Sequence, residues 1–319
     1  MGLRGSKERP YLRKEGTKPL TLNTDKGMQR TEMAERPKVL RAAVNKILHH
    51  SVVDGPGNRA AVFFQGCNFH CAYCHNPETI AMCTSCGHCV EVCPAGALTL
   101  QNGKVRWQQE LCCECDRCIH ECAHLASPRT KDYTAGEIME EIRKDLPFIR
   151  GLTVSGGECS MQRDFVVELF RLAKAEGLST LMDSNGSYDY SKDEELLAVC
   201  DGVMLDIKAF DEEEHKKLTG QSREMVLKNA VYLAGCGKLE EIRTVVVPEF
   251  LSGEETVEKV GQMLEPYLKE QKIRYKIIAY RPFGVRVPYK ETLRSPSAEE
   301  LERCKEIAKS YGFSEVVVI

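Results

Sequence analysis

The sequence predicts an α/β protein: an incomplete barrel of about six strand–helix units, interrupted by a small cysteine-rich insert. Apolar runs of the length of buried strands alternate along the chain with helical stretches, which indicates a parallel sheet with right-handed crossovers. Twelve of the sixteen cysteines fall between Cys67 and Cys122, directly after the first of these strands. Without the insert and a basic N-terminal segment, the chain is shorter than the roughly 250 residues typical of a full eight-fold barrel.

The predicted strands and helices follow one another along the chain. The strands are seven short apolar runs, each suited to a buried position in a parallel sheet. They lie at Ala60–Gln65, Leu152–Ser155, Thr180–Met182, Val203–Ile207, Ile242–Val247, Ile273–Ala279 and Glu315–Val318. Capping boxes, in which a Ser or Thr is followed three residues later by Glu, predict the start of four helices. The boxes are Thr134–Glu137, Ser191–Glu194, Ser252–Glu255 and Ser297–Glu300.

Composition divides the chain into three regions. Residues 1–41 hold eleven Lys and Arg against five Asp and Glu and show little periodicity, which is typical of a flexible, solvated tail. Residues 42–78 and 133–319 carry the strand–helix alternation and are predicted to form the barrel. Residues 79–132 contain two of the three cysteine runs and are predicted to be an inserted domain. Because such barrels keep their active sites at the C-terminal ends of the strands, we expect the insert beside the open mouth.

The bulk composition excludes several classes of protein. With 319 residues, 42% of them hydrophobic and 29% charged, the chain is ordinary for a soluble globular protein. No apolar run approaches the roughly 18 residues of a membrane span, and the N-terminus has no apolar signal-peptide core. The net charge of −3 and the single tryptophan give no indication of nucleic-acid binding. The sequence therefore predicts a cytoplasmic protein without nucleic-acid or membrane partners.

The first cysteine run, Cys67-Asn-Phe-His-Cys71-Ala-Tyr-Cys74, follows the first predicted strand. Three cysteines leave one iron of a four-iron cluster without a protein ligand, and an open position is where a metal site performs chemistry. A structural zinc would require four ligands, and no pair of histidines follows at zinc-finger spacing. Clustered cysteines without an export signal also favour metal binding over disulfides. Cys67, Cys71 and Cys74 are therefore predicted to hold a reactive iron–sulfur cluster.

The second and third runs both have the spacing C-x2-C-x2-C-x3-C, the bacterial ferredoxin pattern for two four-iron clusters. In that pattern the fourth cysteine of each run ligates the other cluster. Crossed ligation places one cluster on Cys83, Cys86, Cys89 and Cys122, and the other on Cys112, Cys115, Cys118 and Cys93. Cys113 is surplus to the pattern and is interpreted as a buried thiol or a neighbour of the cluster. The isolated cysteines, at positions 159, 200, 236 and 304, are interpreted as ordinary buried residues.

Around the first run the sequence resembles the radical S-adenosylmethionine (SAM) superfamily, whose C-x3-C-x2-C loop occupies the same position. Six further segments follow the order found in its glycyl-radical-enzyme activases, such as the pyruvate formate-lyase activating enzymes. They are Asp54–Arg59, Phe63–Gly66, Cys74–Pro77, Ser155–Glu158, Asp183–Gly186 and Met204–Lys208. The resemblance runs from about Val39 to Ile319. The insert makes the chain most similar to the ferredoxin-containing activases of the YjjW type.

The resemblance implies an enzyme that cleaves SAM reductively and abstracts a glycine Cα hydrogen from a partner, a glycyl radical enzyme. It implies SAM, three four-iron clusters and a monovalent cation at the SAM site as cofactors, with flavodoxin or ferredoxin as electron donor. Glu158 is expected to accept from the SAM ammonium group, and Ser184 and Met204 to touch the cation. The residues assigned to SAM binding are Asn76, Gly156, Gly157, Glu158, Asp183, Ser184, Met204, Asp206, Lys208, Arg243 and Val245.

Several of these residues have simpler interpretations. A lone Gly-Gly-Glu is usually only a turn. Asp206 and Lys208, two apart on a strand, could be a solvated ion pair, and Arg243 could pair at the barrel edge. The agreement of seven segments in the same order favours the functional interpretation.

Two other functions fit part of the pattern. A radical SAM enzyme with auxiliary clusters could act on a small molecule or another peptide, although the Asp54–Gly57 and Cys74–Pro77 segments favour an activase. A simple electron carrier could also use the two ferredoxin-type runs. The three-cysteine loop and a barrel larger than a carrier needs argue against an electron carrier.

The pattern has two departures and one chance motif. Arg281 stands where relatives often have histidine, and Ala123 replaces the proline that usually follows the fourth cysteine of a ferredoxin run. His120-Glu-Cys-Ala-His124 matches the H-E-x-x-H motif of zinc proteases. Because Cys122 is already required by the ferredoxin spacing, we interpret this match as coincidental.

Overall fold

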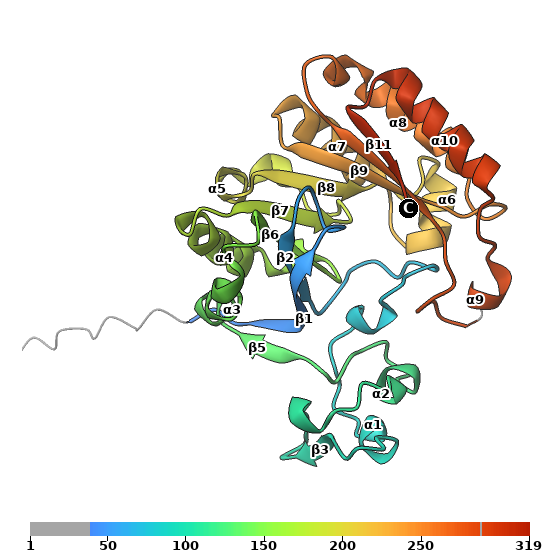
Figure 1. Ribbon diagram of the computed structural model, residues 1–319. Helices are drawn as coiled ribbons and strands as arrows, with labels where there is room; N and C mark the ends of the chain where they lie inside the picture. Colours follow the sequence, from blue (N-terminus) through green and yellow to red (C-terminus); the bar gives the residue numbers. More distant parts are fainter. Residues whose placement is uncertain (1–38, 288) are drawn as a thin grey trace, which may run out of the picture. The chain divides into compact units, whose positions relative to one another are not determined.

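The computed structural model describes residues 39–287 and 289–319 (Figure 1). Its centre is a nine-stranded mixed sheet in the order β11-β10-β9-β8-β7-β6-β2-β1-β5. β1 (Ala42–Ser51) pairs antiparallel with β2 on one side and with β5 (Lys131–Tyr133) on the other. The seven strands from β2 to β11 run parallel: β2 Arg59–Phe64, β6 Gly151–Gly156, β7 Ser179–Ser184, β8 Gly202–Asp206, β9 Leu239–Val246, β10 Arg274–Ala279 and β11 Glu315–Val318. The predicted tail lies outside the described residues, apart from its last three positions.

Helices connect the parallel strands and lie on the outer side of the sheet (Figure 1). The apolar faces of the long helices are buried against the strands; Phe165 of the first long helix, for example, packs edge-to-face on Phe64 of β2. The helices are α3 Ala135–Ile142, α4 Arg163–Ala175, α5 Glu194–Val199, α6 Glu212–Thr219, α7 Glu224–Gly235, α8 Gly253–Leu268, α9 Tyr289–Thr292 and α10 Ala298–Tyr311.

The predicted α/β class is confirmed, and all seven apolar runs form strands. The prediction missed β1 and β5. β1 carries Asn45, Lys46 and His49 on a half-exposed face, so its pattern is not the continuous apolar run of a central strand. β5 has three residues, two of them exposed, and is too short to give a pattern.

Two of the four predicted capping boxes are confirmed and two are wrong. Thr134 and Ser297 each accept from the backbone of the third helical residue, and the Glu side chain returns the contact. At the second position Asp193, not Ser191, caps α5 by accepting from the Leu196 N–H. Ser252 precedes α8 without capping it, and its backbone N–H and its hydroxyl both donate to Glu214 of α6. Long-range partners thus compete with local caps.

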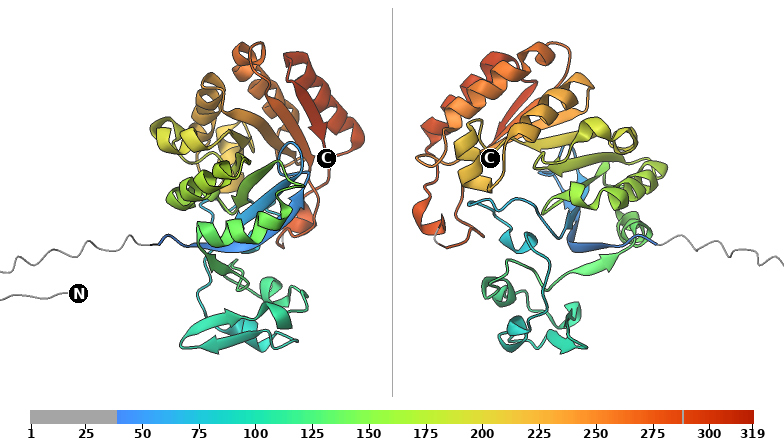
Figure 2. Two further views of the ribbon diagram at one scale, coloured as in Figure 1. Left: turned by 60° about the vertical axis from the view of Figure 1, so that its left-hand side comes forward. Right: turned by 180° about the vertical axis from the view of Figure 1, so that it is seen from behind.

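Between β2 and β5 the chain forms a small lobe outside the sheet (Figures 1 and 2). It contains α1 His88–Glu91, α2 Arg117–His120 and an antiparallel hairpin of β3 Leu98–Gln101 and β4 Lys104–Trp107. Two backbone hydrogen bonds, Ala81 N to Leu125 O (3.0 Å) and Ser127 N to Glu78 O (2.8 Å), close its base. The boundaries predicted at 79 and 132 stay a prediction.

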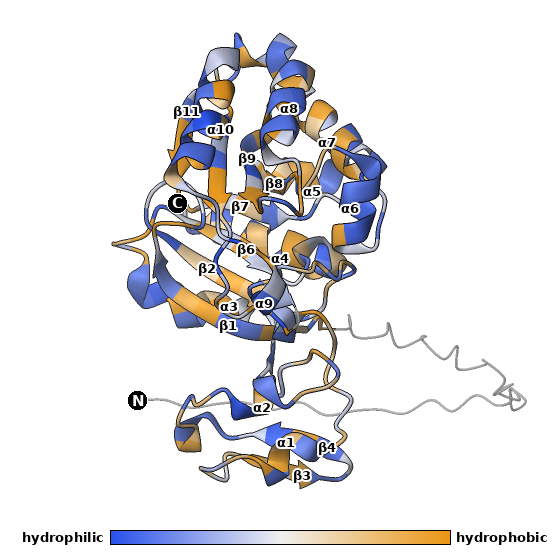
Figure 3. Ribbon diagram, turned by 90° about the vertical axis from the view of Figure 1, so that its right-hand side faces the viewer, coloured by the Kyte–Doolittle hydropathy of each residue, from blue (hydrophilic) through white to orange (hydrophobic). Residues whose placement is uncertain are grey.

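The main core lies between the sheet and the outer helices, where hydrophobic strand residues face the inner sides of the helices (Figure 3). The lobe has its own small apolar cluster, built around Leu98 and two buried cysteines. Over the described ranges, none of the helices combines the length and apolarity needed to cross a lipid bilayer.

Candidate active site

The C-terminal ends of the parallel strands enclose a cavity of about 240 Å³. The loop after β2 contributes Cys67, Cys71 and Cys74 to its wall. Nine of the eleven residues predicted to bind SAM also line it: Asn76, Gly156, Gly157, Asp183, Ser184, Asp206, Lys208, Arg243 and Val245. The fold therefore brings together side chains from five strands that are far apart in the sequence.

The cysteine loop is held in place mainly by backbone contacts. The N–H groups of His70 and Ala72 donate to carbonyls at the end of α6, both at 3.0 Å. Burial raises the pKa of the Cys67 thiol to about 12 and that of Cys74 to about 11. Thiols this buried become thiolates only beside a strong local positive charge such as a metal centre. Three such thiols in one loop fit a cluster that is bound through three protein ligands.

The glycine pair after β6 packs against the backbone that leads into this loop. Gly157 N donates to Phe64 O at 2.9 Å, and Glu158 N donates to Gly66 O at 2.8 Å. A Cβ on Gly157 would lie 2.0 Å from Gly66 O, so only glycine permits this approach.

Gly157→Ala is expected to lower the free energy of unfolding by about 1–3 kcal/mol, the usual effect of overpacking, and to weaken SAM binding. Unfolding titrations and equilibrium binding would measure the two effects. Gly136 is the matched control, because it lies in α3 with open space around its Cα. Gly136→Ala should raise stability by roughly 0.5–1 kcal/mol. Equal behaviour of the two variants would contradict the close-approach argument.

Asp183 and Arg243 form the polar centre of the cavity. Arg243 Nη1 pairs with Asp183 Oδ2 at 2.9 Å, and the Ser155 hydroxyl donates to the same oxygen at 2.9 Å. Burial nevertheless raises the pKa of Asp183 above its usual range, with Arg243 opposing the shift. The second oxygen, Oδ1, takes no part in either contact. Asp183 can therefore still accept a cationic group from the cavity.

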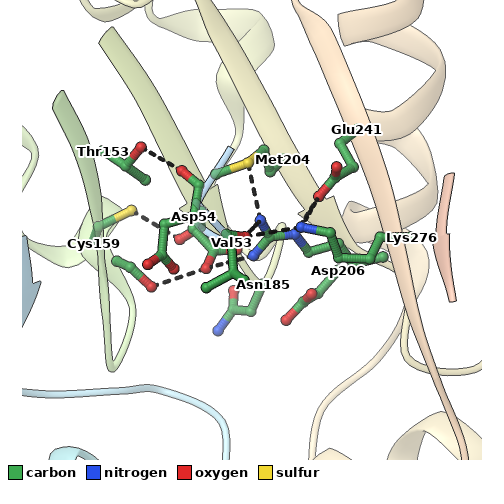
Figure 4. Close-up of polar contacts among 12 residues, drawn as sticks. Val53, Asp54, Thr153, Cys159, Asn185, Met204, Asp206, Glu241 and Lys276 are labelled. Carbon is green, nitrogen blue, oxygen red and sulfur yellow. Dashed lines mark hydrogen bonds and ion pairs between the residues drawn. The ribbon is translucent and has the colours of Figure 1, made fainter. Parts of the chain in front are cut away.

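Behind Arg243 lies a buried charge layer centred on Glu241, which is fully buried (Figure 4). Glu241 Oε1 pairs with Arg243 Nε at 2.7 Å and with Lys276 Nζ at 3.0 Å. Arg274 Nη1 lies 3.2 Å from Oε2. Lys276 Nζ also donates to the Val53 carbonyl at 2.9 Å. This layer fixes the Arg243 guanidinium and ties the loop before β2 to the barrel interior.

Asp206 and Lys208 form an ion pair of 2.7 Å at the end of β8, on the cavity wall. Lys208 also lies above the Tyr73 ring, 5.8 Å from its centroid. Burial alone would lower the pKa of Lys208, but Asp206 outweighs it and the pKa is raised. The pair thus belongs to the cavity wall, with the Lys208 side chain largely buried, and is not a solvated surface pair.

Glu158 and Met204 do not line the cavity, unlike the other predicted SAM residues. The Glu158 carboxylate accepts from Ser160 N at 3.0 Å, from the Ser184 hydroxyl at 3.0 Å and from Asn185 N at 2.7 Å. The Met204 sulfur accepts from Arg243 Nη2 at 3.0 Å. Both side chains therefore hold other wall residues in place.

The sequence interpretation missed several wall residues, among them Asn185, His75 and Tyr73. Asn185 lies inside the Asp183–Gly186 segment, and its Nδ2 lies 3.9 Å from the Cys67 sulfur. The charge layer behind the wall was also missed. Lys276 gave a detectable signal, because a lysine inside an apolar strand run requires a buried partner.

The lobe contains two further cavities, and each groups cysteines from both ferredoxin-type runs. One, of about 130 Å³, is lined by Cys83, Cys86, Cys89, Cys118 and Cys122. The other, of about 20 Å³, is lined by Cys93, Cys112, Cys113, Cys115 and Cys118. Cys118 lines both cavities.

Not every cysteine lies where the sequence suggested. Cys236 is exposed, so its interpretation as a buried residue is wrong. Cys113 is also exposed, which contradicts a buried thiol, while its place in the wall of the smaller cavity leaves the interpretation as a cluster neighbour a prediction. Cys159, Cys200 and Cys304 are buried, as predicted. Across the residues that the structure describes, no three His, Cys, Asp or Glu side chains are arranged to hold a single metal ion.

Comparison with known proteins gives consistent matches. The radical SAM superfamily matches residues 61–260. The chain is 31% identical over 288 residues to a pyruvate formate-lyase-activating enzyme of Streptococcus mutans, covering 85% of this chain and 92% of the relative. It is 32% identical over 289 residues to a trans-4-hydroxy-L-proline dehydratase activating enzyme of Clostridioides difficile, covering 83% and 95%. The structure of Streptococcus suis SuiB bound to S-adenosylmethionine aligns with a TM-score of 0.51 at 13% identity, over 79% of this chain and 48% of that one, and supports the fold alone.

The chain belongs to the radical SAM superfamily. Within it, similarity over most of both chain lengths makes this protein an enzyme of the glycyl-radical-enzyme activating type.

Proposed function

We propose that the cavity at the strand ends binds SAM against a four-iron cluster held by Cys67, Cys71 and Cys74. The observation that carries this proposal is the convergence of the three thiols with Asp183, Arg243 and the backbone of the glycine pair on one cavity. When bound there, the cluster and SAM together supply a 5′-deoxyadenosyl radical, which can take a hydrogen atom from a glycine Cα of a partner enzyme.

The chain's own residues bind and orient the reactants. The backbone of Gly156 and Gly157 approaches the ligand closely, and Asp183 Oδ1 accepts a cationic group, either from SAM or from a monovalent cation beside Ser184. Lys208 and Arg243 supply positive charge for the SAM carboxylate. Asn76 and Val245 complete the wall. Glu158 acts indirectly, because its carboxylate accepts from the Ser184 hydroxyl and the Asn185 backbone N–H and so orients both.

The partner is proposed to be a glycyl radical enzyme. An anaerobic pull-down, followed by electron paramagnetic resonance (EPR) of the captured protein, tests this directly. After incubation with SAM and a reductant, the captured protein is expected to show a glycyl radical signal, and samples without SAM should show none. A SAM-dependent product on a small molecule, with no radical on any captured protein, would support the alternative class of radical SAM enzyme.

We further propose that the lobe is a ferredoxin-like insert with two four-iron clusters in crossed ligation. Cys83, Cys86 and Cys89 share a cavity with Cys122, and Cys112, Cys115 and Cys118 share the other with Cys93, which supports the crossed arrangement. The first set follows closely on Ala81, whose carbonyl accepts from the Gln65 side chain two residues before Cys67. The clusters are thus suited to pass electrons from a flavodoxin or ferredoxin toward the SAM site.

Loss of both insert clusters, through Cys86→Ala with Cys115→Ala, is expected to slow activation driven by flavodoxin or ferredoxin at least tenfold. A small chemical reductant diffuses into the cavity by itself, so activation with dithionite should change much less. SAM cleavage would be measured with both reductants. Equal losses with both, together with weaker binding of the glycyl radical enzyme, would instead assign the lobe to partner docking.

A further inference from the structure

The single tryptophan of the chain lies at the end of β4, in the wall of the cavity around Cys112. The indole Nε1 of Trp107 is buried and has no hydrogen-bond partner among the described residues. A buried N–H without a partner costs about 1–3 kcal/mol and is rare in folded proteins. This N–H therefore requires an acceptor, and the acceptors of the same cavity are the cysteine sulfurs and the Asp116 carboxylate, which already pairs with Arg129.

Arg129 lines the same cavity as Trp107. Its Nη2 pairs with Asp116 at 2.6 Å, which holds the guanidinium beside the cysteines. The indole and the guanidinium thus both lie in the wall that these cysteine sulfurs share.

The cavity around Cys83 is built differently. Apart from its cysteines, its wall consists of Thr84, His88, Val105, Glu121, Ala123, His124, Ala126 and Pro128, with no Arg, Lys or Trp. Glu121 adds a negative charge there, and His88 and His124 are largely exposed to water. The two cysteine sets are equivalent in spacing but not in their hydrogen-bond donors.

We propose that the Trp107 indole N–H and the Arg129 guanidinium donate to the sulfurs of the cluster on Cys93, Cys112, Cys115 and Cys118, and make it the more easily reduced of the two insert clusters. Reduction adds one electron and one negative charge to the cluster, and donors to its sulfurs stabilise that charge. The inference rests on the proposed insert clusters. The electron comes from the donor protein of the proposed function.

The position of this cluster fits a role as first electron acceptor. Trp107 and Arg129 also line an open cleft of about 440 Å³ between β1, β5 and the lobe. They therefore lie between this cleft and the cysteines of the cluster, of which Cys115 is exposed. The Cys83 set begins two residues after Ala81 in the sequence.

A packing role for Trp107 is the competing explanation, since its ring contacts the lobe's small apolar cluster. Trp107→Phe separates the two roles, because it keeps an aromatic ring and removes only the N–H. EPR during redox titration would measure both clusters, with signals assigned from Cys86→Ala and Cys115→Ala. The comparison is made at the potential where the cluster on Cys93, Cys112, Cys115 and Cys118 is half reduced in the unsubstituted protein. At this potential we expect the ratio of reduced to oxidised cluster to be three- to tenfold lower in Trp107→Phe. The cluster on Cys83, Cys86, Cys89 and Cys122 in the same sample is the internal control, and its ratio of reduced to oxidised form should not change.

An unchanged ratio in Trp107→Phe, or an equal shift of both clusters, would overturn the proposal. If Trp107→Phe binds less iron, the same titration of Arg129→Gln tests the proposal instead. The ratio of reduced to oxidised cluster is again expected to fall. A third measurement needs no variant at Trp107. Its fluorescence in the parent should fall when clusters are assembled, and Cys115→Ala should lose this quenching while Cys86→Ala keeps it. Loss of the quenching in Cys86→Ala, with quenching kept in Cys115→Ala, would also overturn the proposal. An iron content showing no insert clusters would instead refute the proposed ferredoxin-like insert and leave the proposed SAM site unaffected.

Discussion

Replacing Cys67, Cys71 and Cys74 together with alanine is expected to abolish SAM cleavage. Bound iron should fall by about a third, from roughly twelve to roughly eight per chain, because one of three four-iron clusters is lost. The loop's backbone contacts to α6 do not involve the thiols, so the barrel should remain folded. The measurements are iron analysis of reconstituted protein and quantification of 5′-deoxyadenosine and methionine under anaerobic, reducing conditions.

Cys236→Ala is the matched control for this loss. Cys236 is exposed and lies outside all three runs, so its replacement should leave iron content and SAM cleavage unchanged. Continued SAM cleavage by the triple variant would mean that the catalytic cluster has been assigned to the wrong cysteines. A loss of iron from all three sites would indicate that the loop is required for folding.

The second large effect is expected at Glu241, which no motif identified. Glu241→Gln keeps the shape of the side chain but removes the one negative charge shared by Arg243, Arg274 and Lys276. Breaking a buried ion network in this way typically costs about 3–5 kcal/mol, because uncompensated buried charges remain. We expect a loss of this size in the free energy of unfolding, measured by denaturant titration. SAM affinity should also fall, since the Arg243 guanidinium loses its support.

The neighbouring Glu240 is a close control for this substitution. It lies in the same strand, is less buried, and pairs with no cation within ion-pair distance among the described residues. Glu240→Gln should therefore change stability by no more than about 0.5 kcal/mol, as is usual away from special features. Similar losses in the two variants would show that the charge layer does not stabilise the barrel.

Much of the site could be predicted because its determinants are local. Cys67, Cys71 and Cys74 lie within eight residues, so one loop brings them together whatever surrounds it. The strand runs were equally local, since a central parallel strand is apolar along its whole length. Known motifs then placed Asp183, Asp206 and the glycine pair at strand ends, where parallel topology gathers them.

Long-range competition explains what local patterns missed. Ser252 has the sequence of a helix cap, but its backbone N–H and its hydroxyl both donate to the Glu214 carboxylate of α6, and its side chain accepts from no backbone N–H of α8. Glu158 accepts three hydrogen bonds, from Ser160, Ser184 and Asn185, and its predicted contact with SAM stays a prediction. Both residues thus have partners distant in the chain that local patterns do not reveal.

The sequence by itself determined the class of fold, the three-thiol loop and the family, because these depend on spacing and composition within short segments. Only the tertiary structure decided which charges meet. Glu241 and Lys276 are 35 positions apart and pair only because β9 and β10 are neighbours. The structure also decided that Trp107 and Arg129 face one set of lobe cysteines and not the other. Burial makes such pairings obligatory, since a charge or an N–H removed from water must find a partner, but the chain has to fold before that partner is defined.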